Sequence, residues 1–140
     1  MKKSILDTDI LSEVFKGKTP TVSAAARAYL AEHGFLTISA ITVMESVKGY
    51  QRIGREGDIR NFLTTIVDVE VLAIDAPIGV LAGRIQGDLE RTGQTIGRSD
   101  PIIAAVAIKH GLTLVTGNTD HFRRIQALGY PLALDDWRRE

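Results

Sequence analysis

Acidic residues at four separated points of the sequence could together perform hydrolytic chemistry. Each follows an apolar run or lies early in a helix-like segment: Asp7, Glu45, Asp100 and Asp120. Carboxylates that gather at one place raise each other's pKa unless a hard cation neutralises them. Mg²⁺ and Mn²⁺ prefer oxygen ligands, and such ions activate water and polarise phosphoryl groups. The residue types therefore predict a divalent-metal site that hydrolyses phosphodiester bonds.

The elements that must bring these acids together alternate along the chain. Short apolar runs predict strands, and longer segments with helical spacing predict helices. The predicted strands are 5–6, 35–38, 67–74, 112–115 and 131–134, and the predicted helices are 23–32, 40–52, 58–65, 77–91 and 101–110. Parallel strands need long crossovers, so this alternation predicts an α/β protein with helices on both faces of a parallel sheet. Ligands of such sheets bind beyond the carboxyl ends of the strands, where we expect the acids to meet.

Helix capping is a competing explanation for three of the acidic residues. Asp100 precedes Pro101, and an aspartate at a helix start can satisfy free backbone N–H groups without any metal. Asp9 could cap a short helix in the same way, and Asp120 could cap the last helix. Asp7 is harder to explain by structure alone, because it ends an apolar strand where a charge is unfavourable unless it faces a cleft.

Ordinary surface roles could account for other polar residues near these acids. Glu45 has Lys48 one turn further along, so an ion pair on the helix surface could explain it. Gly117-Asn118 is typical of a turn. The histidines stand near predicted helix ends and lack the spacing of a metalloprotease motif, so we interpret them as surface or capping residues: His33, His110 and His121.

Length and composition indicate one ordinary globular domain. The chain has 140 residues, 44% of them hydrophobic and 24% charged, and no cysteine, which excludes disulfides and thiolate metal sites. Equal numbers of basic and acidic residues, 17 of each, give a formal net charge of +0, so a polyanionic partner must be held by local groups. We expect no membrane span, no signal peptide and a cytoplasmic location.

Four segments carry the acids and their neighbours in a fixed order. They are Ile5-Leu6-Asp7-Thr8-Asp9-Ile10-Leu11-Ser12, Ile38-Ser39-Ala40-Ile41-Thr42-Val43-Met44-Glu45, Ile96-Gly97-Arg98-Ser99-Asp100 and Leu114-Val115-Thr116-Gly117-Asn118. In this order and at this spacing they resemble the motifs of PIN-domain ribonucleases, and among them the VapC toxins of toxin–antitoxin pairs. One such motif would be a weak signal, but four in order are specific, and the resemblance spans nearly the whole chain.

The resemblance implies a fold, an activity and partners. The fold would be a PIN-like (Rossmann-like) α/β/α sandwich with a central, mostly parallel sheet of four to five strands, in a single PIN domain over residues 1–140. The activity would be that of a Mg²⁺- or Mn²⁺-dependent endoribonuclease acting on structured RNA such as tRNA or rRNA. The partners would be a cognate VapB-like antitoxin that neutralises this toxin, and a second copy of the chain in a homodimer.

The resemblance also implies roles for single residues. Asp7 and Asp100 would be the principal metal ligands, and Glu45 would help directly or through a water. The supporting polar groups would be Thr8, Asp9, Thr116 and Asn118.

The fourth acidic position departs from the pattern of the family. Many members have an acid where Asn118 stands, so Asp120 or a metal-bound water is expected to substitute. Together these residues predict that a metal-activated water attacks an RNA phosphate, while Glu45 or Asp120 orients the water or accepts a proton. Arg52 and Arg98 are candidates for contacts with the phosphates.

Other functions agree with parts of the sequence. Asp7-Thr8-Asp9 also resembles the aspartate pair of haloacid-dehalogenase-type phosphatases, but the following residues do not continue that motif, and a response-regulator receiver would lack its early paired acids and late lysine. The sequence has no P-loop, G-x-G-x-x-G or G-x-S-x-G motif. The alternative that stays open is a catalytically silent PIN-fold module that binds protein or RNA, which only Asn118 favours.

Overall fold

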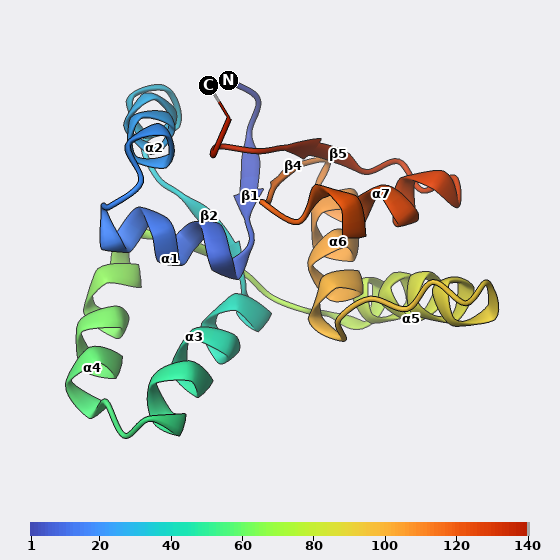
Figure 1. The fold of residues 1–140 in the computed structure, drawn as a ribbon, viewed down its shortest axis with the longest axis horizontal. Coiled ribbons are helices and arrows are strands. Elements are labelled where there is room, and N and C mark those ends of the chain that lie inside the picture. Colours follow the sequence, from blue (N-terminus) through green and yellow to red (C-terminus); the bar gives the residue numbers. More distant parts are fainter. Residues whose placement is uncertain (140) are drawn as a thin grey trace.

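Strands and helices alternate along most of the chain, as the hydrophobic periodicity predicts (Figure 1). The structure is a computed structural model that describes residues 1–139. Its elements are β1 (Ser4–Leu6), α1 (Thr8–Lys16), α2 (Pro20–His33), β2 (Thr37–Ser39), α3 (Ala40–Arg52), α4 (Glu56–Thr65), the 3₁₀ turn η1 (Ile66–Asp68), β3 (Glu70–Leu72), α5 (Ala76–Arg91), α6 (Ser99–His110), β4 (Thr113–Val115), α7 (Thr119–Ala127) and β5 (Ala133–Asp135). No helix within residues 1–139 has the length and apolar character needed to cross a membrane.

The strands form a parallel arrangement at the centre of the molecule. One hydrogen-bonded ladder has the order β1-β4-β5 and a second joins β2 to β3, and every pairing is parallel. β1 and β2 are in contact, so the two ladders adjoin. The prediction of a mostly parallel sheet of four to five strands is confirmed, with the difference that the five strands form two ladders. Each strand has only three residues, which leaves few backbone groups for pairing.

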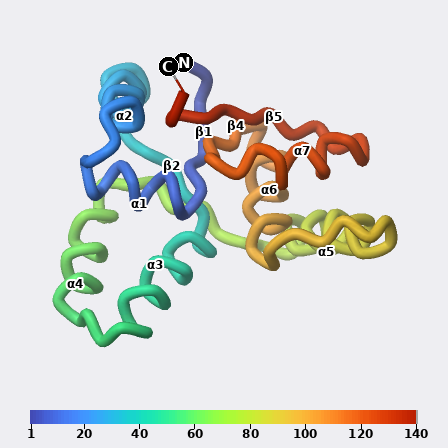
Figure 2. Tube along the Cα trace, in the orientation of Figure 1, coloured from blue at the N-terminus to red at the C-terminus, as the bar shows by residue number. Residues whose placement is uncertain are grey.

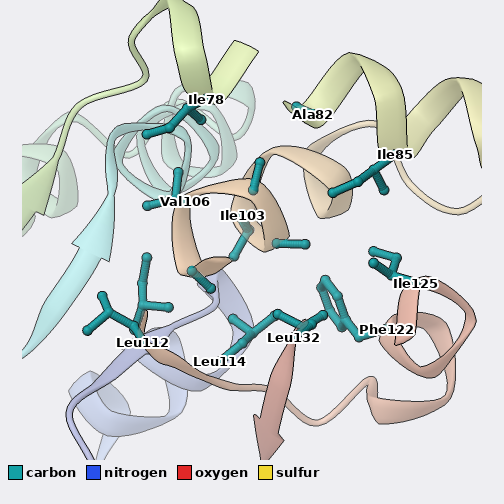
Figure 3. Packing of buried hydrophobic residues seen from close by; sticks show 14 of the residues in the cluster. Ile78, Ala82, Ile85, Ile103, Val106, Leu112, Leu114, Phe122, Ile125 and Leu132 are labelled. Carbon is teal, nitrogen blue, oxygen red and sulfur yellow. The ribbon is translucent and has the colours of Figure 1, made fainter. Parts of the chain in front are cut away.

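Both faces of the sheet are buried at β1, β2 and β4, whereas β3 and β5 are partly exposed. Consecutive strand residues point to opposite faces, and Ile5 and Leu114 belong to one hydrophobic cluster while Leu6 and Val115 belong to another. The first cluster lies under α5, α6 and α7, and Figure 3 shows its side chains meeting around Ile103. The second lies against α1 and α2. Helices therefore cover both faces, which is the predicted sandwich.

A larger share of residues is buried in α6 than in any other helix within residues 1–139. Its buried residues surround the helix: Pro101, Ile103, Ala104, Ala105, Val106 and Ala107. A helix that is apolar all round belongs in the core rather than at the surface. Because α6 leads into β4 and runs opposite to the strands, its first turn lies at the edge where the strands end. This geometry delivers Asp100 to the site.

Helix boundaries agree with the predictions to within a few residues, and α3 occupies 40–52 as predicted. Gly34 and Gly111 end α2 and α6 with φ of 86° and 64°, a conformation that glycine adopts without steric cost. Of the two roles left open for Asp9, capping of the first helix is not the one found. α1 begins directly after β1, so Asp7 is the cap, and its carboxylate accepts from Ile10 N at 2.9 Å.

Tyr29 ties α2 to the start of β1. It is fully buried, Ser4 N donates to its Oη at 3.0 Å, and its hydroxyl donates to Ser4 O at 3.3 Å. Tyr29→Phe leaves both buried backbone groups without this partner, so we expect the free energy of unfolding to fall by about 1–3 kcal/mol. Equilibrium urea denaturation of the wild type and the variant measures this. An unchanged midpoint would contradict the role of the hydroxyl.

Candidate active site

Acids from separate elements line one small cavity at the carboxyl edge of the strands. The cavity has a volume of about 110 Å³, and its lining consists of Asp7, Thr8, Asp9, Glu45, Asp100, Ile103 and Asn118. These residues come from the end of β1, the first turns of α1 and α6, the middle of α3 and the loop after β4. The structure thus brings together three of the four predicted acids and three of the predicted supporting groups.

Asp7 is the most buried acid of the cavity, with 6% of its surface exposed. One carboxylate oxygen accepts from Ile10 N at 2.9 Å, and the other accepts from the Thr116 hydroxyl. Thr116 in turn accepts at 3.0 Å from Asn118 N, so one buried hydroxyl connects the end of β4 to Asp7. These bonds fix the direction of the carboxylate. Thr116 therefore acts on the site from behind Asp7, without lining the cavity itself.

The surroundings of Asp7 favour its protonated form. Burial raises the pKa of Asp7 from 3.8 to about 6. The hydrogen bonds from Thr116 and from Ile10 N lower this pKa, and the negative charges of Asp9 and Asp100 raise it. A carboxylate that is held in place while burial and like charges work against its ionisation is a common feature of functional sites.

Glu45 is held by the first turn of α1. The Thr8 hydroxyl donates to Glu45 Oε1 at 2.6 Å, and the hydroxyls of Thr8 and Thr42 lie 3.2 Å apart. These contacts join α1 to α3 across the cavity. The alternative of a surface ion pair with Lys48 is not found among the ion pairs of residues 1–139. Glu45 thus faces the cavity rather than the helix surface.

Asp100 lies in the first turn of α6 and faces His121 of α7. Burial raises the pKa of Asp100, the contact with His121 lowers it, and the charges of Glu45 and Asp9 raise it. His121 Nδ1 lies 3.6 Å from Asp100 Oδ2. The helix begins at Ser99 with Arg98 at the N-cap position, so Asp100 lies within the first turn and not at the cap. Capping therefore does not account for Asp100.

His121 is a neighbour of the site, although its sequence position predicts only a surface or capping residue. Its side chain is 47% exposed, yet it approaches an acid of the cavity. The sequence feature that could have indicated this contact is the position of His121 three residues after Asn118. It places His121 in the first turn of α7, at the edge of the sheet where the strands end. A lone histidine near a helix end carries too little pattern to reveal that contact.

Besides Thr116, three predicted site residues lie outside the cavity. The Asp120 side chain is 88% exposed and pairs with Arg123 at 2.9 Å, so the structure places Asn118, and not Asp120, at the fourth position of the cavity. Asp120 lies on the exposed side of the first turn of α7, because the helix begins just after Asn118. Arg98 is exposed at the start of α6 and does not line the cavity. Arg52 lies in a neighbouring cavity.

A segment near the end of the chain packs against two elements that carry site residues, α1 and the loop after β4. The Arg138 Nε donates to both carboxylate oxygens of Glu13 in α1, at 2.9 and 3.1 Å. Its guanidinium lies over Gly117, where an added Cβ would collide with Arg138 Nη1. Trp137 is buried with its ring 5.6 Å from Tyr29, and Figure 2 follows this segment back toward α2. The sequence gives no local signal for a contact 125 residues apart.

The donor set suits a hard divalent cation. Across residues 1–139, no three His, Asp or Glu side chains are arranged, as they stand, to hold a metal ion. Mg²⁺ needs no such cage, because it keeps several waters and binds through one or two carboxylates. Asp7 and Asp100 have raised pKa values and lie beside further carboxylates, so a cation would relieve their mutual repulsion. The residues present therefore fit Mg²⁺ or Mn²⁺.

Comparison with known proteins agrees with this geometry. The family model described as "PIN domain" matches residues 4–128. The chain is 30% identical over 138 residues to a "tRNA(fMet)-specific endonuclease VapC" of Shigella flexneri, covering 98% of this chain and 99% of the relative. It is 34% identical over 128 residues to "Ribonuclease VapC1" of Rickettsia felis, covering 89% and 91%. A solved structure, "DNA bound VapBC from Salmonella typhimurium", superposes with a TM-score of 0.80 at 29% identity, covering 98% and 99%.

The raised pKa of Asp7 predicts a pH dependence of stability in the metal-free protein. The folded state binds the Asp7 proton more tightly than the unfolded state, so the stabilisation is full below pH 3.8 and is lost as the pH rises through about 6. Asp7→Asn keeps an oxygen for Ile10 N and removes the ionisation. In EDTA we expect this variant to be more stable than the wild type by roughly 1–3 kcal/mol above about pH 7, and of similar stability near pH 4. Urea unfolding at both pH values measures the difference, and an equal difference at both would contradict the prediction.

The contact between Arg138 and Gly117 predicts a coupled effect of two substitutions. Gly117→Ala must displace the guanidinium, and Arg138→Ala removes it, so each breaks the same contact with Glu13. We expect each to lower the free energy of unfolding by up to about 1 kcal/mol, because the pair is partly exposed. The double variant should be no less stable than the worse single variant. Thermal unfolding of the wild type, the two single variants and the double variant completes this double-mutant cycle. Additive losses of stability would show that the two positions act separately.

Proposed function

The chain belongs to the PIN domain family, and from that premise we propose that it is a divalent-metal-dependent endoribonuclease of the VapC type, the toxin of a toxin–antitoxin pair. We also propose that residues 1–140 form one PIN domain and that the chain acts in the cytoplasm, where RNA is available. The observation that carries the proposal is the meeting of Asp7, Glu45 and Asp100 in one cavity.

We assign the residues of the cavity distinct tasks. Asp7 and Asp100 would hold Mg²⁺ or Mn²⁺, since they are the acids whose pKa burial raises. When bound, the ion polarises a phosphate oxygen and lowers the pKa of a water. Glu45, which Thr8 holds in place at 2.6 Å, would orient the attacking water and accept its proton. Asn118 would supply a neutral polar group at the fourth position, and Asp120 has no part in the reaction.

The partners follow from the named relatives. Relatives called ribonuclease and endonuclease support RNA as the substrate, and we include tRNA and rRNA among the test substrates because one relative is named for a tRNA. The solved VapBC assembly supports a VapB-like antitoxin as the protein that neutralises this chain. We further propose that the chain forms a homodimer.

Two matched substitutions test the nuclease. We expect the wild type to cut a pool of small RNAs at discrete positions in Mg²⁺ or Mn²⁺ and to leave the pool intact in EDTA. Asp100→Asn should reduce cleavage by about 100-fold or more, because it removes a charge that the metal requires. Asp120→Asn makes the same chemical change at an exposed position outside the cavity and should leave cleavage within about twofold of the wild type. End mapping by sequencing gives the cut positions.

Other outcomes would reject specific parts of the proposal. Cleavage that survives Asp100→Asn would point to a contaminating nuclease. The absence of any cleavage by a folded wild type, together with no thermal stabilisation by Mg²⁺ or Mn²⁺, would favour the silent binding module. If Asp120→Asn abolishes cleavage, Asp120 and not Asn118 would fill the fourth acidic position of the site.

A further inference from the structure

A second cavity opens directly beside the acidic one. It has a volume of about 410 Å³, and Thr8, Asp9 and Glu45 line both cavities. The walls are α1 and α3, and Phe62 of α4 contributes to the lining. Figure 1 shows these three helices together on one side of the sheet. We call this second cavity the side groove. Its volume lies within the range of pockets that hold small organic groups.

Aromatic rings give the side groove flat apolar surfaces. Phe15 and Tyr50 flank Phe62, with ring centroids 6.1 and 6.5 Å from that of Phe62. Phe62 is only 4% exposed, whereas Phe15 is 36% exposed and Tyr50 is half-buried. Unpaired nucleobases stack on such rings in RNA-binding proteins, and every base offers a flat face to them.

Charge is distributed along the side groove in one direction. On α1, Asp9 is followed seven residues later by Lys16, and on α3 Glu45 is followed seven residues later by Arg52. Seven residues are two helical turns, or about 10 Å, so on each helix an acid at the active-site end is matched by a base two turns away. Lys16 and Arg52 form no ion pair with residues 1–139.

This layout suits a nucleotide better than a peptide helix. An amphipathic helix is recognised by a continuous apolar groove, whereas this groove has charged ends of opposite sign and the polar side chains of Ser12 and Ser46 in its lining. A nucleotide in a chain has a phosphate on either side of its base. One phosphate would lie at the acidic cavity with its metal, and the next would meet the cations.

We propose that the side groove is a nucleobase-binding subsite for the nucleotide next to the cleaved phosphate. Its unpaired base stacks on Tyr50 and Phe15, and its outer phosphate contacts Arg52 and Lys16. The inference rests on the proposed nuclease function and adds to it a place where bases are distinguished. The choice of target then depends in part on one base beside the cut.

Short RNAs with and without a base test the subsite directly. The probes are a uridine pentamer, an adenosine pentamer and a pentamer whose central ribose lacks a base. The full chain carries Asp100→Asn, which lies outside the side groove and is expected to slow cleavage about 100-fold or more. Its aromatic side chains are isotope-labelled for NMR in Mg²⁺. We expect the ring signals of Phe15 and Tyr50 to shift with the intact pentamers and to stay in place with the abasic one.

Variants in the same background locate the contacts. Tyr50→Leu keeps an apolar side chain against Phe62, and it should raise the Kd of at least one intact pentamer roughly tenfold while leaving the Kd of the abasic pentamer unchanged. Arg52→Ala, at an exposed position, should weaken all three pentamers and reduce the salt dependence of binding. Arg84→Ala removes the same charge on α5, away from the side groove, and should change none of them.

The results separate the subsite from the nuclease function. Equal shifts and equal Kd values for intact and abasic pentamers would overturn the subsite, as would binding that leaves the Phe15 and Tyr50 signals in place. Failure of all three pentamers to bind would overturn it too, and signals that move only with an amphipathic peptide would show a protein-docking surface instead. If the wild type cuts RNA in any of these cases, the nuclease function stands without the subsite. Base-dependent shifts in a chain that cuts no RNA would support the subsite and reject the nuclease.

Discussion

The site depends on a carboxylate that the fold keeps almost entirely out of water. Asp7 is 6% exposed, and burial raises its pKa to about 6 although two hydrogen bonds favour its ionised form. Burying a charge among other carboxylates is unfavourable unless a cation or further bonds compensate. The surrounding structure must therefore hold the acids in place against their own repulsion. Two hydrophobic clusters, one on each face of the sheet, provide that rigidity.

The register of two strands sets the geometry at Asp7. Leu6 of β1 pairs with Val115 of β4, so the next residues along each strand, Asp7 and Thr116, emerge side by side at the same edge. Their hydrogen bond joins residues 109 positions apart. A slip of one residue would turn Asp7 toward the other face of the sheet and separate it from Thr116. The pairing that completes the core is thus the same pairing that orients the carboxylate.

The sequence predicted those parts of the site that follow from periodicity, and it missed those that depend on the direction of a loop. Asp7, Glu45 and Asp100 could be placed together because parallel strands end at one edge and α6 starts there. Asp120 and Asn118 are two residues apart, and only the turn before α7 decides which of them faces the cavity. The Arg138 contact with Glu13 joins the two ends of the chain, so no local pattern could reveal it. The strand predicted over 67–74 is shorter in the structure, because η1 occupies residues 66–68 and β3 spans only Glu70–Leu72.

Charge placement explains how a chain with a formal net charge of +0 can act on a polyanion. The acids of the cavity would repel RNA if no cation were present, and the whole molecule exerts no long-range attraction to offset this. In the proposed function, attraction would come from a metal held by Asp7 and Asp100 and from Lys16 and Arg52, which form no ion pair within residues 1–139. Helices α1 and α3 would meet this need, because each has an acid at the acidic cavity, Asp9 or Glu45, and a base two turns later. Helices α1 and α3, which line both cavities, would therefore both supply acids to the site and set the direction in which bound RNA extends from it.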